Sequence, residues 1–361
     1  MIGDMVDLNL PGQIFAYGFS YRKRNILRAL LPSIQVTFVS VVASTPPDAV
    51  IIIWGAKEVS GCLLEQRQVI RVEDGFFRSI GLGSDFIYPN SLVFDRSGIY
   101  FDARSPSGLE NILNEGAFSQ EDLVRAEQIR QLITKNRLTK YNTELSIAYS
   151  LDLDDKKLIL VPGQVEDDAS ILFGGGSIKT NLGLLKAVRA ENPEAYIIYK
   201  PHPDVQALNR KGRLAEKLAL QYANLIEHKR SVIDCIDVAD EIHTMTSLVG
   251  FDALLRDKKV VTYGEPFYAG WGLTQDRYLD GDALKRRTRQ LTTGQLVAGA
   301  LIHYAIYWDW RLKKFISCEA ALCRLAADRD ALVASGQLEK LRVGFIRRQL
   351  RKLSRLAYSF G

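Results

Sequence analysis

The residues best suited to chemistry stand in four loops, each directly after a short apolar run. One loop, from Gln164 to Ser170, reads Gln-Val-Glu-Asp-Asp-Ala-Ser and gathers three carboxylates. A glycine run at 174–176 lies just beyond, and glycines let a backbone approach a ligand closely or move. A carboxylate here, such as Asp168, can attack an anomeric carbon as a nucleophile. The alternative is a solvated acidic loop.

A second loop, Lys200-Pro201-His202-Pro203, holds a cation, followed by an imidazole that lies between two prolines. Proline fixes φ, which lowers the entropy lost in holding these side chains in place. Lys200 and His202 suit a phosphate group, and His202 can also donate to a leaving phosphate oxygen. The alternative is a structural histidine.

A third loop places two carboxylates and an arginine after a short strand, in Glu73-Asp74-Gly75-Phe76-Phe77-Arg78-Ser79. Gly75 permits a tight turn beside the charges. Glu73 and Asp74 are candidates for a general acid/base and for acceptor binding. The alternative is an Asp74 that caps a helix and is salt-bridged to Arg78.

The fourth loop, from Gly264 to Gly272, interleaves glycine with aromatic residues, and its Glu265 is placed to accept hydrogen bonds from a ribose. A cluster of hydroxyls that includes Thr246 and Ser247 also opens an expected helix. Free amides and the helix dipole attract anions there, although Ser247 can equally be a plain N-cap. In open α/β sheets, ligands bind beyond the carboxyl ends of strands, so these loops belong at one site.

Several other kinds of site are not expected. The sequence has no GxxxxGK[ST] phosphate loop and no GxGxxG, and its four histidines lack HxxH or HExxH spacing, so we predict no metal. The run Asp152-Leu153-Asp154 resembles a DxD metal motif only superficially, because it lies in a polar segment ahead of a strand. The scattered cysteines indicate reduced thiols in a cytosolic protein; they are Cys62, Cys235, Cys318 and Cys323.

The charge is concentrated in the last residues. Segment 337–361 carries seven basic residues and one acid, an excess of +6 within a formal total of +5, so residues 1–336 sum to −1. This distribution argues against a nucleic-acid-binding surface on the main fold. Segment 338–358 alternates leucines and arginines, which predicts an amphipathic basic helix on an anionic membrane surface. The alternative is a terminal helix packed across the domains.

The elements that must position these loops alternate between strands and helices. Apolar or β-branched runs at 14–20, 35–42, 49–54 and 69–72 are typical of buried parallel strands, with a helical stretch at 21–31. Residues 91–102 predict a hairpin and 121–138 an amphipathic helix. The rhythm resumes with strands expected at 157–161, 195–199, 224–227, 241–244 and 259–263, and helices at 181–191, 205–220, 231–237 and 248–255.

The 361 residues are too many for one ordinary core, and the polar stretch 140–155 is the expected boundary. We predict an α/β, GT-B-like fold: two Rossmann-type doubly wound domains with a cleft between them, plus C-terminal helices. Residues 1–145 form the acceptor-side domain, 146–290 the nucleotide-sugar domain, and 291–361 the C-terminal helices. No apolar run approaches the ~20 residues of a membrane span, and the acidic N-terminus does not resemble a signal peptide, so we expect a cytoplasmic protein.

Taken in their order along the chain, the four loops resemble those of the bacterial capsule polysaccharide biosynthesis/export family. They cover residues 71–79, 163–170, 200–204 and 263–273, and the similarity runs from about residue 17 to residue 307. Four separate loops in order are far more specific than any single motif. The family contains retaining β-Kdo transferases that are similar in fold to GT-B enzymes and use CMP-Kdo as donor substrate. Many members of its capsule-linker branch carry two such modules, whereas this chain has room for one.

The resemblance implies roles for the donor-side candidates. The anomeric carbon of Kdo bears a carboxylate and no hydrogen, so a cation such as Arg78 or Lys200 must hold it. His202 and the helix start at Ser247 would stabilise the departing CMP phosphate. The aspartate of the family's Gln-Val-x-x-Asp, here Asp168, would be the nucleophile of a double displacement.

The resemblance also implies an acceptor side, where Glu73 or Asp74 would deprotonate the acceptor hydroxyl, and further ligand contacts from Gln164, Ser170 and Thr246. The predicted function is transfer of Kdo to a lipid-linked or glycan acceptor in capsular or surface polysaccharide biosynthesis, without a cofactor and at the periphery of the inner membrane. One alternative is a GT-B-fold transferase that uses another nucleotide sugar. The other is a non-catalytic polysaccharide assembly or export component.

Overall fold

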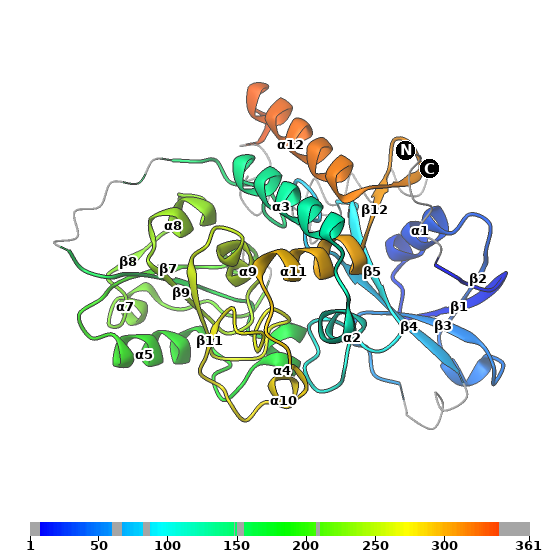
Figure 1. Ribbon diagram of the computed structural model, residues 1–361, viewed down its shortest axis with the longest axis horizontal. Coiled ribbons are helices and arrows are strands. Elements are labelled where there is room, and N and C mark those ends of the chain that lie inside the picture. Colours follow the sequence, from blue (N-terminus) through cyan, green and yellow to red (C-terminus); the bar gives the residue numbers. More distant parts are fainter. Residues whose placement is uncertain are drawn as a thin grey trace.

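The computed structural model describes residues 8–59, 67–81, 87–147, 149, 155–206 and 210–338. In this part of the chain, two sheets lie in separate halves of an elongated molecule, with helices packed around them (Figure 1). Cys62, the Asp152-Leu153-Asp154 run and residues 339–358 of the expected membrane-binding helix lie outside the described residues. No described helix combines the length and apolar character that crossing a membrane requires.

The N-terminal sheet has seven strands in the order β13-β12-β5-β4-β3-β1-β2. Its parallel part comprises β1 (Gln13–Tyr17), β2 (Gln35–Val39), β3 (Val50–Trp54) and β4 (Gln68–Asp74). Its antiparallel part comprises β5 (Ser91–Asp95), β12 (Ala305–Asp309) and β13 (Lys314–Ile316). The sheet is therefore mixed, and the prediction of a purely doubly wound N-terminal domain needs this correction.

The predicted hairpin at 91–102 is wrong. Only β5 forms, and it pairs with β4 and β12 instead of with a following strand. The Asp95 carboxylate explains the break, because its Oδ1 accepts from the backbone N–H groups of Ser97 and Gly98, both at 2.8 Å. These bonds turn the chain away from the sheet directly after β5.

The C-terminal sheet has six strands in the order β11-β10-β9-β6-β7-β8, and every pairing is parallel. The strands are β6 (Leu158–Pro162), β7 (Tyr196–Lys200), β8 (Leu225–Ile226), β9 (Glu241–Thr244), β10 (Lys259–Thr262) and β11 (Gln275–Asp276). All residues of β6 and β9 are buried. The sequence predicted five of these strands, because a strand covered on both faces needs a continuous apolar run.

The helices cover both sheets (Figure 1). In the first half they are α1 (Tyr21–Leu30), η1 (Val42–Ser44), α2 (Gly108–Glu115) and α3 (Gln120–Lys135). In the second half they are α4 (Ala169–Gly174), α5 (Asn181–Glu191), α6 (Pro203–Gln206), α7 (Glu216–Ala219), α8 (Val232–Val238), α9 (Leu248–Leu254) and α10 (Asp282–Arg286). They are followed by α11 (Thr293–Val297), the π-helical η4 (Ala298–Tyr304) and α12 (Cys318–Ala334).

The single helix predicted at 205–220 is also wrong, since only α6 and α7 form at its ends. Part of the intervening segment bonds to other parts of the chain. The Lys211 carbonyl accepts from the Glu166 N–H at 3.2 Å, and the Gly212 carbonyl accepts from Asn181 at 3.0 Å. Gly212 adopts a φ of +121°, which a side chain rarely tolerates. The segment therefore braces the acidic loop instead of extending a helix.

The C-terminal segment returns to the first half of the molecule. We expected only helices after residue 290, but β12 and β13 complete the N-terminal sheet. In addition, α11, η4 and α12 pack against α3, and η4 also packs against α2 (Figure 1). One apolar cluster contains Ile129 of α3 together with Leu160 of β6 and Phe251 of α9. The two halves therefore share one apolar core, to which residues of both contribute.

Candidate active site

A cavity of about 270 Å³ lies beyond the carboxyl ends of the C-terminal strands, facing the N-terminal half. Loops after β6, β7, β9 and β10 line one side, while Tyr100, Phe101 and the connecting segment 139–144 line the other. Seven predicted site residues meet here: Gln164, Asp168, Ser170, Lys200, His202, Thr246 and Ser247. Four others do not line the cavity: Glu73, Asp74, Arg78 and Glu265.

Asp168 is the N-cap of α4. Its Oδ1 accepts from the backbone N–H of Ser170 at 3.0 Å and from the Ser170 hydroxyl at 2.9 Å. Its Oδ2 has no hydrogen-bond partner among the described residues. One carboxylate oxygen is therefore held in place while the other is left available at the cavity.

A chain of hydrogen bonds leads from the buried Gln164 to Asp168. The Gln164 amide donates to the Thr246 hydroxyl at 2.9 Å, and that hydroxyl donates to the Ser170 hydroxyl at 3.3 Å. Ser170 in turn donates to Asp168. The side-chain oxygen Oε1 of Gln164 is also occupied, since it accepts from the Thr246 N–H at 3.0 Å. These side chains line the cavity and at the same time orient the carboxylate.

The three adjacent acids have different partners. Glu166 accepts from the backbone N–H of Asn181 at 2.8 Å, whereas Asp167 is exposed and pairs with Arg210 at 3.1 Å. Asn181 is 1% exposed and holds both backbone groups of Gln164, accepting from its N–H at 2.8 Å and donating to its carbonyl at 2.9 Å. Only Asp168 of the three lines the cavity.

His202 lines the cavity as a neutral ring. Its Nδ1 accepts from the backbone N–H of Asp204 at 3.1 Å, so the ring proton must lie on Nε2. Burial lowers the pKa of His202, against the opposing effect of Asp204 and Asp168. A neutral imidazole with Nε2–H is a hydrogen-bond donor suited to an anionic oxygen.

Lys200 is buried and already paired. Its ammonium lies 3.0 Å from Glu144 Oε1 and donates to the Arg230 carbonyl at 2.6 Å. Glu144 also accepts from the Val232 N–H at 2.7 Å, which ties the connecting segment to α8. Phosphate binding by Lys200 stays a prediction, and in the structure this lysine fastens the connecting segment to β7.

The Glu73–Asp74 pair lies within β4 and not in the loop after it, because the strand extends to Asp74. Arg78 donates to Asp74 at 2.5 Å, to the Ser79 hydroxyl at 2.8 Å and to the Ile87 carbonyl at 2.8 Å. Arg78 is 4% exposed, so its guanidinium is committed to this local network. A Cβ on Gly75 would lie 2.0 Å from the Ser91 hydroxyl oxygen, so close strand packing explains the glycine.

Glu73 differs from its neighbour in having no salt bridge among the described residues. Its Oε1 accepts from the Asp74 N–H at 2.9 Å. Burial and then the nearby Asp74 raise the pKa of Glu73, while Lys23 opposes the shift. The carbonyl of the adjacent Asp74 accepts from the hydroxyl of Tyr100 at 3.3 Å, and Tyr100 lines the cavity, so this end of β4 lies behind the N-terminal wall.

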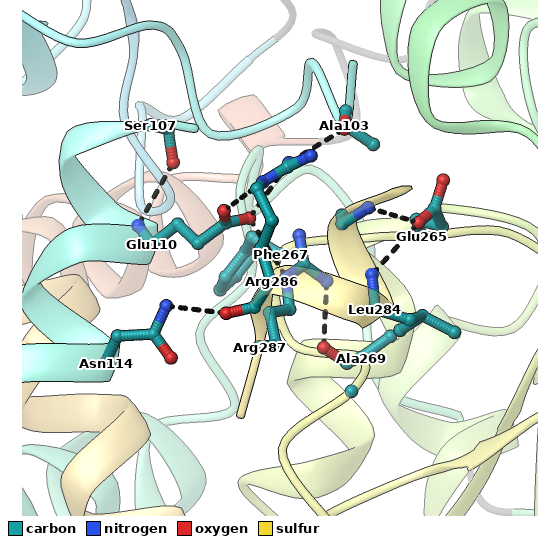
Figure 2. A network of polar contacts seen from close by, with 12 residues as sticks. Ala103, Ser107, Glu110, Asn114, Glu265, Phe267, Ala269, Leu284, Arg286 and Arg287 are labelled. Atoms are coloured by element: carbon teal, nitrogen blue, oxygen red, sulfur yellow. Dashed lines mark hydrogen bonds and ion pairs between the residues drawn. The ribbon is translucent and has the colours of Figure 1, made fainter. Parts of the chain in front are cut away.

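Glu265 lies away from the cavity and caps α10. Its Oε1 accepts from the backbone N–H groups of Ala283 at 2.8 Å and Leu284 at 3.1 Å (Figure 2). The glycine run at 174–176 packs beside it, with Gly175 bridged to Gly264, instead of lining the cavity. The ribose contact expected of Glu265 therefore has no support from its position.

The same view shows an ion cluster joining the two halves. Figure 2 shows Arg286 and Arg287, at the end of α10, converging on Glu110 of α2, at 2.6 Å and 3.3 Å. Arg287 also donates to the Pro266 and Ala269 carbonyls at 2.6 and 2.8 Å. Burial lowers the pKa of Arg287, and Glu110 opposes that shift.

Several lining residues were missed from sequence, chiefly in the connecting segment that was assigned only as a domain boundary. Lys140 lines the cavity and forms no salt bridge with the described residues. Burial acts to lower the pKa of Lys140, but the acidic groups around it, led by Tyr141 and Tyr100, raise it overall. Lys140 is therefore a charged group facing the cavity. The only sign of these residues in the sequence was the polar stretch 140–155, which was expected at the boundary between the domains.

Comparison with known proteins gives consistent matches. Residues 50–307 match the family described as Capsule polysaccharide biosynthesis protein. The capsule polysaccharide modification protein LipA of Neisseria meningitidis serogroup B is 42% identical over 361 residues, which cover 97% of this chain and 50% of LipA. The lipopolysaccharide-processing protein LpsZ of Rhizobium meliloti is 35% identical over 336 residues, covering 88% of this chain and 75% of LpsZ. The chain thus spans about half the length of LipA.

Two solved structures of KpsC from Thermosulfurimonas dismutans share the fold. The one described as a beta Kdo 2,7 transferase has a TM-score of 0.72 and 38% identity, covering 87% of this chain and 99% of that one. The one described as a beta Kdo 2,4 transferase has a TM-score of 0.74 and 28% identity, covering 88% and 99%. With a family match over most of its length, this chain belongs to the capsule polysaccharide biosynthesis protein family.

Proposed function

We propose that this protein is a retaining β-Kdo transferase that moves Kdo from CMP-Kdo to a lipid-linked or glycan acceptor in capsular or surface polysaccharide synthesis. The observation that carries the proposal is Asp168, whose Oδ1 is held by Ser170 while its Oδ2 is left available at a cavity between the two halves. The KpsC chains of the same fold support Kdo as the transferred sugar. The two-sheet architecture supports a GT-B-like division of donor and acceptor sides.

The first displacement uses the groups at the donor side. Asp168 attacks the anomeric carbon of Kdo, the bond from that carbon to the phosphate oxygen breaks, and CMP leaves with the bonding electrons. His202 donates a hydrogen bond from Nε2 to the departing phosphate, because its other ring nitrogen is already an acceptor. Since Arg78 and Lys200 are both paired, Lys140 is the better candidate to hold the Kdo carboxylate.

The second displacement needs a base for the acceptor hydroxyl. The Asp74 carboxylate is held in an ion pair by Arg78, whereas Glu73 forms no salt bridge with the described residues. Glu73 has a pKa raised by burial and by Asp74, and lies behind the cavity wall on the N-terminal side. We therefore assign Glu73 as the base. The acceptor oxygen attacks the glycosyl–Asp168 ester, its proton passes to Glu73, and the Asp168 carboxylate is regenerated.

The test is replacement of the nucleophile. Asp168→Ala should lower Kdo transfer roughly a thousandfold or more while CMP binding persists, because the lost group acts in the chemical step. Asp167→Ala is the matched control, since Asp167 is exposed and paired with Arg210, and it should keep near wild-type activity. Transfer from CMP-Kdo to sugar and lipid acceptors would be followed by mass spectrometry, and the linkage by NMR.

Two further measurements complete the test. Intact mass spectrometry of the wild-type protein with CMP-Kdo and no acceptor should show one added Kdo residue, which Asp168→Ala should lack. Turnover of UDP- or GDP-sugars in place of CMP-Kdo would contradict the donor assignment. Binding of CMP without any turnover would instead indicate a non-catalytic assembly component. Near wild-type turnover by Asp168→Ala would overturn the nucleophile assignment.

A further inference from the structure

One acid at the cavity has no part in the mechanism above. Asp252 lies on α9, is 4% exposed and lines the cavity. Its carboxylate has no hydrogen-bond or ion-pair partner among the described residues. The other acids on the cavity wall have contacts that are already described. Asp168 is held by Ser170 and Glu144 by Lys200, while the backbone N–H of Asp204 donates to His202.

The surroundings of Asp252 do not satisfy it. Arg256, in the turn that follows α9, donates at 2.8 Å to the backbone carbonyl of Asp252 and not to its carboxylate. The Tyr268 hydroxyl, which also interacts electrostatically with Asp252, donates to the Ser247 carbonyl instead. Apolar residues form the nearby wall, including Leu248, Val249 and Phe267. Burial raises the pKa of Asp252 to about 7, and Arg256 opposes the shift.

A buried carboxyl group without partners destabilises a folded protein, so its position calls for a partner that arrives with a ligand. The required chemistry is two hydrogen-bond donors that can reach the two oxygens together. A cationic donor fits poorly, because Arg256 already lies beside this site and would repel it. Vicinal hydroxyl groups fit well, because each supplies one O–H donor.

We propose that Asp252 is a donor-binding residue whose carboxylate accepts hydrogen bonds from the vicinal hydroxyls of the nucleotide's ribose. This inference rests on the proposed function only in taking the donor to be a nucleotide sugar. Asp168 and Asp252 come from different elements of one cavity wall, so the reacting sugar and the nucleoside have separate acidic partners. The assignment replaces the ribose role expected of Glu265, which caps α10.

Calorimetric titration with CMP and with 2′-deoxy-CMP tests the contact. The wild-type protein should bind CMP about tenfold to a hundredfold more tightly than 2′-deoxy-CMP, as expected for a hydrogen bond to a charged group. Asp252→Asn should weaken CMP binding and lose most of that preference. Asp276→Asn is the control, because Asp276 is fully partnered by Thr262, Thr274 and Gly270 outside the cavity, and it should keep the wild-type preference.

Thermal unfolding of the unliganded protein gives a second readout. Asp252→Asn should raise the melting temperature. Its advantage should grow from about pH 5 to about pH 7 and then stay level to about pH 8, because over that first range the unfolded carboxyl has already lost the proton that the folded, buried carboxyl still holds. Asp276→Asn should lower the melting temperature at both pH values.

The outcomes separate the two proposals. If the wild type binds CMP and Asp252→Asn keeps the same preference for CMP over 2′-deoxy-CMP, the role of Asp252 alone is overturned. Wild-type preference for UMP or GMP with a lost 2′-hydroxyl preference in Asp252→Asn would overturn CMP-Kdo as donor but support Asp252. A protein that binds none of these nucleotides would overturn both.

Discussion

At the scale of single residues, three neighbouring carboxylates of one loop have different roles because each has different partners. Glu166 is bound to the backbone of Asn181, Asp167 to the exposed Arg210, and Asp168 to Ser170 with one oxygen left over. The sequence could identify the acidic loop, because it follows an apolar strand. It could not predict that Asp252 is left unsatisfied, since an isolated acid on a helix carries no sequence signal of burial.

Ser170 allows a direct test of positioning against ligand binding. Ser170→Ala removes the hydroxyl that donates to Asp168 and accepts from Thr246. We expect kcat to fall roughly tenfold, the loss of a hydrogen bond to a charged group, with little change in the KM for the donor. Ser170→Thr, which keeps the hydroxyl, should recover most of the rate. A raised KM with normal kcat would show that Ser170 binds substrate instead.

At the scale of elements, the sequence predicted the buried strands well and the connections poorly. The apolar runs of β3 and β6 left little choice, because both strands are buried along their whole length. The failures at 91–102 and 205–220 have a common cause. In each, the backbone bonds to a group that the local pattern does not reveal, namely the Asp95 carboxylate and the distant Asn181.

Asn181, the first residue of α5, is the clearest element-scale test. Asn181→Ala would leave the backbone groups of Gln164 and the carbonyl of Gly212 without partners in a buried site. We expect the free energy of unfolding to fall by about 3 kcal/mol, since each unsatisfied buried group costs roughly 1–3 kcal/mol. Urea titration would measure it. Thr180→Ala, which removes only the N-cap bond of the same helix, should cost about 1 kcal/mol.

At the scale of the whole molecule, the two halves and the cleft were predicted, but not the groups that join them. Glu110 lies 176 positions before Arg286 and contacts it through side chains alone, so no local pattern announces the pair. The Lys200–Glu144 contact is hidden in the same way, within a polar stretch that reads as a simple linker. Long-range ion pairs depend on how the two halves dock, which sequence spacing does not contain.

The Glu110 cluster provides a test at this scale. Glu110→Ala would strand the buried Arg287 and the partly buried Arg286 without their shared carboxylate. We expect a loss of about 3–5 kcal/mol in unfolding free energy, because breaking a buried pair leaves an uncompensated charge. Glu115→Ala, an exposed change on the same helix, should be nearly neutral by urea unfolding. Equal stability of the two variants would contradict a joining role for the cluster.

The return of β12 and β13 to the N-terminal sheet has a consequence for the order of folding during synthesis. The C-terminal sheet is built from residues 158–276 without interruption, so it can be completed as soon as that stretch has been made. The N-terminal sheet must wait for β13, which ends at Ile316, and until β12 has been made β5 is an unpaired edge. The half of the protein that is synthesised first is therefore finished last, and its open edge is the point where a nascent chain is most exposed to aggregation.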